Sequence, residues 1–137
     1  MSPIRVANAP VSWGAIMFEG FGEDGHGYKQ VMDEIAATGY AGTELGDYGF
    51  YPTDPEILRA ELDARNLAML GAYVAHHLRE GGELFELDLA QALTVARLLA
   101  AVVPDQDRSK GPFLVIADVN GTDPGRSLNA GRRLAHW

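Results

Sequence analysis

The chain contains no cysteine and no apolar segment long enough to cross a bilayer. The missing cysteines exclude a disulfide framework, a thiolate metal site and a cysteine nucleophile. A membrane span needs about 20 consecutive apolar residues, and no stretch of this chain approaches that length. The first residues also lack the basic and apolar regions of a signal peptide. We therefore expect a cytoplasmic protein with no membrane partner.

Basic residues are also scarce, because 11 Lys and Arg stand against 19 Asp and Glu and the formal net charge is −8. A protein that binds nucleic acid usually carries a basic face, so we expect no nucleic-acid partner. Arg126, Arg132 and Arg133 gather in the last segment of the chain. We expect a solvated surface there rather than a phosphate contact.

What the chain does have is ample apolar material, with 47% hydrophobic residues in a length of 137. That length suits one domain with its own core and is short for two domains. We therefore predict a single domain over residues 1–137.

Strand-like and helix-like segments alternate along the chain. Thr53 and Glu56 have the spacing of a capping box, which predicts a helix start. Gly39 is expected to end the preceding helix in a left-handed conformation. Strands are predicted over Ile4–Val11, Tyr40–Leu45, Leu67–Ala75 and Phe113–Ala117, and helices over Tyr28–Gly39, Thr53–Asn66, Glu83–Val103 and Leu128–Trp137.

Two of these segments carry further expectations. Phe113–Ala117 is apolar on both faces, which is typical of a strand buried on both sides in a parallel sheet. The long helix over Glu83–Val103 shows an apolar stripe that is expected to face the core. The stripe consists of Leu89, Ala92, Leu93, Ala96, Leu99, Ala100 and Val103.

The order of elements predicts an α/β protein with a parallel sheet and right-handed crossovers. Two architectures fit this order: a small open doubly wound sheet, or half of a (β/α)₈ barrel, which normally needs about 250 residues. The chain has no GxxxxGK[ST] segment, so a P-loop version of the open sheet loses support. A fourth strand without a full covering helix leaves one apolar face open, which indicates an interrupted architecture.

In parallel α/β folds, ligands bind at the carboxyl ends of the strands, so the polar residues there are the candidates for chemistry. Asn8 lies in the first predicted strand and Trp13 follows it, and Glu44 lies at the end of the second. A carboxylate at Glu44 could accept a substrate hydroxyl, bind a metal or act as a general base. The alternative for Glu44 is a structural ion pair or hydrogen bond with a neighbouring loop.

His76 and His77 follow the third predicted strand. Adjacent residues of an extended strand point to opposite sides, so one of the two is expected to face a ligand and the other to lie at the surface or against a helix. Asp118 ends the fourth strand and could coordinate a cation or orient His76. The alternative, slightly favoured, is a turn-forming aspartate before Asn120 and Gly121.

Three segments together carry a family resemblance: ANAPVSWG at Ala7–Gly14, GYAGTELGDYGFYP at Gly39–Pro52, and AYVAHHL at Ala72–Leu78. They resemble the sugar-phosphate isomerase/epimerase superfamily with a xylose-isomerase-like TIM barrel, and within it the inosose dehydratases. The resemblance extends from about Ile4 to Gly131.

The resemblance implies a (β/α)₈ barrel that binds one divalent cation, Mn or Co, at the carboxyl ends of its strands. It implies proton abstraction next to a carbonyl of a keto-polyol, as in the dehydration of 2-keto-myo-inositol in myo-inositol catabolism. Carried over by position, Glu44 and His76 would be catalytic. Asn8, Trp13, His77 and Asp118 would bind substrate.

In this family the metal ligands lie mainly on strands 5 to 8, and four strands are predicted here. The resemblance therefore assigns no metal ligand to this chain and implies a barrel truncated after strand 4. The first hypothesis is the N-terminal part of a lyase or isomerase, inactive alone. The second is a non-catalytic half-barrel that self-associates or binds a partner or a polyol. A third hypothesis rebuilds a metal site across a dimer from Glu44, His76 and Asp118.

Overall fold

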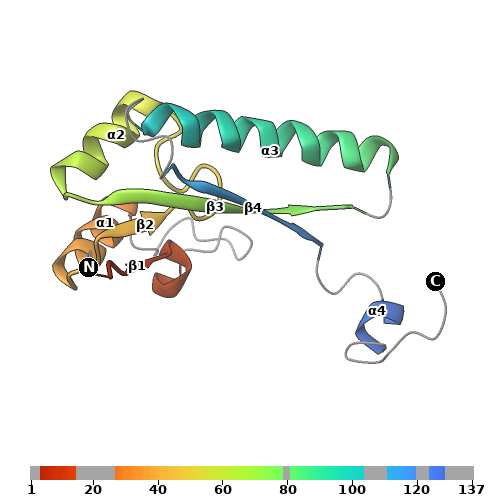
Figure 1. Cartoon of the computed structure of the whole chain (residues 1–137), viewed down its shortest axis with the longest axis horizontal. Helices are drawn as coiled ribbons and strands as arrows, with labels where there is room; N and C mark the ends of the chain where they lie inside the picture. Colours follow the sequence, from red (N-terminus) through yellow and green to blue (C-terminus); the bar gives the residue numbers. More distant parts are fainter. Residues whose placement is uncertain (1–3, 15–26, 79–80, 104–110, 120–123, 129–137) are drawn as a thin grey trace.

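A computed structural model of the chain describes residues 4–14, 27–78, 81–103, 111–119 and 124–128. All strand pairs in it are parallel, and the strands form one sheet in the order β1-β2-β3-β4 with helices between them (Figure 1). This arrangement is half-barrel-like and confirms the predicted fold class. The elements are β1 (Ala7–Asn8), a 3₁₀ turn η1 (Pro10–Trp13), α1 (Tyr28–Ala37), β2 (Gly42–Glu44), α2 (Pro55–Ala64), β3 (Ala68–His76), α3 (Gly82–Val102), β4 (Phe113–Asp118) and α4 (Pro124–Leu128).

The helix boundaries follow local chemistry. Gly39 has a φ of 84° after the end of α1, which confirms the predicted left-handed residue. The start of α2 differs from the prediction, because Asp54 caps it in place of Thr53. The Asp54 carboxylate accepts hydrogen bonds from the backbone N–H groups of Glu56 at 2.8 Å and Ile57 at 3.2 Å. The predicted capping box is therefore wrong by one residue.

The first strand is shorter than the predicted Ile4–Val11. Regular pairing covers Ala7 and Asn8, and the 3₁₀ turn begins at Pro10. Proline has no N–H to give to a strand ladder and favours the first turn of a helix, so strand structure ends before it. The predicted helix over Leu128–Trp137 lies outside the described residues after Leu128, and α4 ends at that residue.

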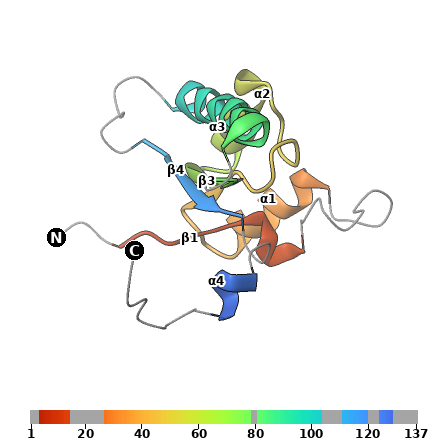
Figure 2. The same ribbon diagram turned by 90° about the vertical axis from the view of Figure 1, so that its right-hand side faces the viewer.

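One face of the sheet is covered by α1, α2 and α3, as the view along the sheet shows (Figure 2). Side chains from all three helices and from β3 meet in one apolar core. Its members include Val31, Met32, Ile35, Leu45, Tyr51, Leu58, Leu62, Met69, Ala72, Val74, Ala92, Val95, Leu98, Leu99 and Val102, all less than 10% exposed. No helix in the described part of the chain combines the length and the apolar character that crossing a membrane requires.

The opposite face of the sheet, called the open face, includes Glu44, Gly71, Tyr73, Phe113 and Val115. These residues are placed there by the register, which pairs Gly71 with Glu44 and Phe113, and Tyr73 with Val115. Phe113 is 76% exposed and Val115 is 53% exposed. The prediction that the fourth strand is buried on both sides is therefore wrong. Within the described residues no helix packs on this face, and α4 lies away from it beyond the end of β4 (Figure 1).

The inward face of α3 also differs from the predicted stripe. Leu89 and Leu93 are exposed, and of the seven predicted residues only Ala92 and Leu99 are buried. The helix is apolar nearly all round, so spacing alone does not select the face that packs. The buried residues of the helix are Ala92, Val95, Leu98, Leu99 and Val102.

Candidate functional site

Glu44 is the last residue of β2 and points to the open face. Its neighbours Thr43 and Leu45 are buried in the core, and side chains alternate along a strand, so Glu44 is turned the other way and is exposed. Its carboxylate makes no hydrogen bond or ion pair with any described residue. The structural ion pair that was the alternative for Glu44 is absent from the described part of the chain.

The strand that carries Glu44 is fixed from the core side. The hydroxyl groups of Thr43 and Tyr51 lie 3.1 Å apart and share a hydrogen bond, and both side chains are buried. Burial raises the pKa of the Tyr51 phenol, and the hydrogen bond shared with Thr43 partly opposes this. The phenol thus stays protonated and ties the loop after β2 back onto the strand.

His76, the last residue of β3, lies on the helix-covered face. Its side chain is 3% exposed and meets the ring of Phe85 on α3 edge to face, with the ring centroids 4.7 Å apart. The Nδ1 atom of His76 is buried and has no hydrogen-bond partner among the described residues. It lies 3.9 Å from Oδ2 of Asp88, which is beyond hydrogen-bond distance.

The structure does not bring Glu44 and His76 together. Glu44 pairs with Gly71, and His76 lies five residues further along β3. At the rise of a β-strand this separation is roughly 16 Å, and the two side chains also lie on opposite faces of the sheet. The catalytic roles of both residues stay predictions.

His77 is turned toward α3 by a tight bend after β3, in which the Leu78 N–H donates to the His76 carbonyl at 2.9 Å. The Nδ1 atom of His77 lies 2.7 Å from Oδ2 of Asp88, and the His77 backbone N–H donates to the same oxygen at 2.7 Å. Both imidazoles therefore have Nδ1 near Asp88. The prediction that they point to opposite sides is wrong, because the extended strand ends at His76.

Asp118 lies beside His76 in the register of β3 and β4. Its Oδ1 accepts a hydrogen bond from the Leu78 backbone N–H at 3.3 Å. Asp118 thus links the end of β4 to the bend after β3. Asn120 and Gly121, which were part of the predicted turn, lie outside the described residues.

Asp88 is the functional candidate that the sequence reasoning missed. It lies on α3 one turn before Ala92, on the side of the helix that packs inward, and its side chain is 23% exposed. Hydrogen bonds from the backbone N–H and the imidazole of His77 lower its pKa below the ordinary aspartate value. The sequence signal for Asp88 was an acidic residue on the inward face of the helix that follows the two histidines. It was not recognised, because the predicted apolar stripe placed a different face of that helix against the core.

Asn8 and Trp13 are held by local contacts near β1. Oδ1 of Asn8 accepts hydrogen bonds from the Ala9 backbone N–H and the Ser12 hydroxyl, both at 2.8 Å. Nε1 of Trp13 donates to Oε2 of Glu34 on α1 at 2.7 Å, and the ring packs against the core. These contacts secure the turn at η1, and the substrate-binding roles of both residues stay predictions.

The described residues include no group of three His, Asp or Glu side chains that could hold a metal ion. Glu44 lies on the face opposite His76 and Asp118, so one copy of the described chain does not assemble those three. The Mn or Co ion that the resemblance implies therefore finds no donor set in this part of the chain.

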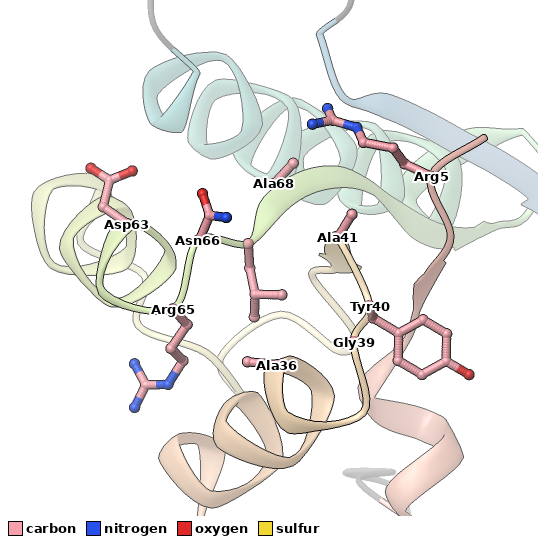
Figure 3. A pocket seen from close by; sticks show the side chains of 10 residues that line it. Arg5, Ala36, Gly39, Tyr40, Ala41, Asp63, Arg65, Asn66 and Ala68 are labelled. Carbon is pink, nitrogen blue, oxygen red and sulfur yellow. The ribbon is translucent and has the colours of Figure 1, made fainter. Parts of the chain in front are cut away.

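A pocket of about 540 Å³ lies at the other end of the sheet, where β2 and β3 begin. Arg5 and Arg65 lie on opposite sides of it, with Tyr40 and Asn66 nearby (Figure 3). Arg65 is paired with Asp33 and with Glu61, at 2.6 Å each. The charge of Arg65 is therefore compensated, and the pocket lies far from the residues predicted to carry chemistry.

The fold and these residues define an α/β protein with a half-barrel-like parallel sheet and polar groups at its strand ends. No protein-family model matches the chain. It is similar to curated inosose dehydratases. It shares 34% identity over 79 residues with that of Salmonella typhimurium (58% of this chain, 25% of the relative) and 33% over 108 residues with that of Lactiplantibacillus plantarum (75% and 34%). With that of Erwinia tasmaniensis it shares 29% over 85 residues (62% and 28%).

These matches confirm the predicted resemblance to inosose dehydratase over 58–75% of this chain, which is less than the predicted extent from about Ile4 to Gly131. The chain spans about a third or less of the length of the curated relatives it matches.

Proposed function

We propose that this chain carries the N-terminal share of an inosose-dehydratase-like or sugar isomerase/epimerase-like enzyme that acts on a keto-polyol, and that it is inactive alone. The observation that supports the proposal is the parallel, half-barrel-like sheet with His77, Asp88 and Asp118 clustered at the carboxyl ends of β3 and β4. The similarity to inosose dehydratases supports the substrate class.

In this proposal Glu44 accepts a substrate hydroxyl or serves as the general base on the open face, where its carboxylate is accessible. His76 is the second proposed catalytic group, and Asn8, Trp13, His77 and Asp118 are proposed substrate contacts. The divalent cation of the family would supply Lewis-acid chemistry, but the described residues do not hold it, so no step is assigned to it. The proposed location is the cytoplasm.

We expect the isolated chain to bind 2-keto-myo-inositol weakly, with a dissociation constant on the order of mM, and not to dehydrate it in the presence of Mn²⁺ or Co²⁺. The binding is expected to be weak because the chain supplies only part of the substrate contacts. Turnover is not expected because Glu44 and His76 lie apart. The test is a turnover assay together with backbone amide chemical shifts. Shifts should move at Glu44 and at the ends of β3 and β4.

The matched control ligand is myo-inositol, which lacks the carbonyl and should cause smaller shifts. Turnover by the isolated chain would contradict the proposed inactivity. Shifts confined to the pocket between Arg5 and Arg65 would contradict the proposed location of the site.

A second candidate function is a non-catalytic half-barrel that associates with a second copy of itself. The specific observation in its favour is the exposed apolar surface of Tyr73, Phe113 and Val115 on the open face. Four parallel strands with an edge at β1 and an edge at β4 also supply half of the eight strands of a closed barrel.

For this candidate we expect a dimer in sedimentation velocity that the Val115→Lys variant weakens at least about tenfold, because the variant buries an unpaired charge at the contact. Ile57→Lys is the control, since Ile57 is 52% exposed on α2, away from the open face. Equal behaviour of the two variants would exclude the open face as the dimer contact. A dimer that binds no keto-polyol would favour this candidate over the enzyme.

A further inference from the structure

Asp88 and His77 form a carboxylate–imidazole pair at the carboxyl end of β3. A single oxygen, Oδ2 of Asp88, lies 2.7 Å from the backbone nitrogen of His77 and 2.7 Å from its Nδ1 atom. The two contacts fix both the main chain and the ring of His77 relative to α3. The imidazole is 27% exposed, so it is held without being buried.

The pair also determines where the imidazole carries its proton. The hydrogen bonds from His77 lower the pKa of Asp88, so its side chain is a carboxylate at neutral pH and can only accept hydrogen bonds. The Nδ1 atom of His77 must then be the donor. In the neutral ring the lone pair is left on Nε2, which makes Nε2 the acceptor or base.

Two other titratable groups of the described residues, His76 and Asp118, lie near the pair. His76 Nδ1 lies 3.9 Å from the same Asp88 oxygen, too far for a hydrogen bond. On the neighbouring strand, Oδ1 of Asp118 accepts from the Leu78 backbone N–H. The 2.7 Å from Oδ2 of Asp88 to Nδ1 of His77 is a hydrogen-bond distance.

We propose that Asp88 is a positioning residue that holds His77 in the Nδ1–H form, so that Nε2 of His77 accepts a hydrogen bond from a hydroxyl group of the keto-polyol. The inference rests on the proposed function for the identity of the ligand. An oriented carboxylate fixes the tautomer of an imidazole, and here it acts on a ring at the ligand-binding edge of the sheet.

The test is ¹⁵N NMR of the His77 ring at a pH well above the usual imidazole pKa of about 6.5. In the wild-type chain we expect Nδ1 to resonate as a protonated nitrogen and Nε2 as an unprotonated one. Asp88→Ala removes the acceptor, so the proton should move to Nε2, the form that neutral histidine prefers in water. Asp88→Asn keeps an acceptor oxygen and should preserve the wild-type form.

Glu86→Ala is the matched control, because Glu86 is an exposed acid two residues earlier on α3. It should leave the His77 resonances unchanged. For 2-keto-myo-inositol we expect Asp88→Ala to weaken binding about tenfold, or about 1.4 kcal/mol, which lies within the range of one oriented hydrogen bond, and Glu86→Ala to leave binding unchanged.

The outcomes separate this inference from the proposed function. Wild-type His77 protonated at Nε2, or resonances that Asp88→Ala does not move, would overturn the positioning role even if the wild-type chain binds the keto-polyol. The wild-type His77 ring could instead be protonated at Nδ1 in a chain that does not bind the keto-polyol. That result would overturn the keto-polyol as the ligand and with it the proposed function. A moved proton together with weaker binding supports both.

Discussion

Replacing Leu58 with alanine is expected to lower the free energy of unfolding by about 3 kcal/mol. Leu58 is fully buried where α2 meets the core, and its truncation removes apolar contacts and leaves a cavity that close-packed neighbours do not fill. The measurement is chemical denaturation followed by circular dichroism. A loss of this size is a large share of the stability of a small domain.

Ile57→Ala is the matched control for this variant. Ile57 precedes Leu58 on the same helix and is 52% exposed, so its truncation should cost less than about 1 kcal/mol. Similar losses for the two variants would show that α2 does not pack on the sheet through the face described above.

Replacing Gly71 with alanine is expected to destabilise the chain by about 2–3 kcal/mol and to disturb the pairing of β3 with β4. A β-carbon at this position would overlap the backbone oxygen of Phe113. The obstructing atom belongs to the main chain and cannot rotate away, so the strands must shift. Denaturation gives the loss, and amide chemical shifts along β4 locate it.

Gly27→Ala serves as the control, because a β-carbon there meets no atom within 4 Å and the φ of −59° suits any residue. We expect its effect to stay within about 1 kcal/mol. If Gly71→Ala were as mild as Gly27→Ala, the close approach of β3 and β4 at Phe113 would be disproved.

Much of the fold could be predicted because local chemistry and periodicity agreed. Strand β3 and helix α1 fall within a residue or two of their predicted bounds, since glycine and turn residues mark the chain at Gly39 and near Asn66. The fourth strand was located correctly, but its exposure was not. An apolar run shows that a strand can be buried on both faces, whereas burial depends on whether other elements cover it.

The candidate site was predicted only in part. The end of β3 was correctly expected to carry polar groups, but side-chain directions there depend on a bend at His77 that strand periodicity does not contain. Asp88 was missed because α3 is apolar on most sides, and the packed face had to be known before its carboxylate could be placed. The separation of Glu44 from His76 follows from the register of β2 on β3, which the sequence pattern does not show.

The consecutive strand order has a consequence for how such a sheet can be lengthened. Each strand pairs only with the strands next to it in the chain, and each crossover returns to the adjacent position. A sheet with this strand order can be extended one unit at a time, because an added strand–helix unit has to pair with only one existing edge strand. Duplication of a gene segment, or fusion to another, could therefore extend the sheet at the edge of β4 while the pairing from β1 to β3 stays as it is.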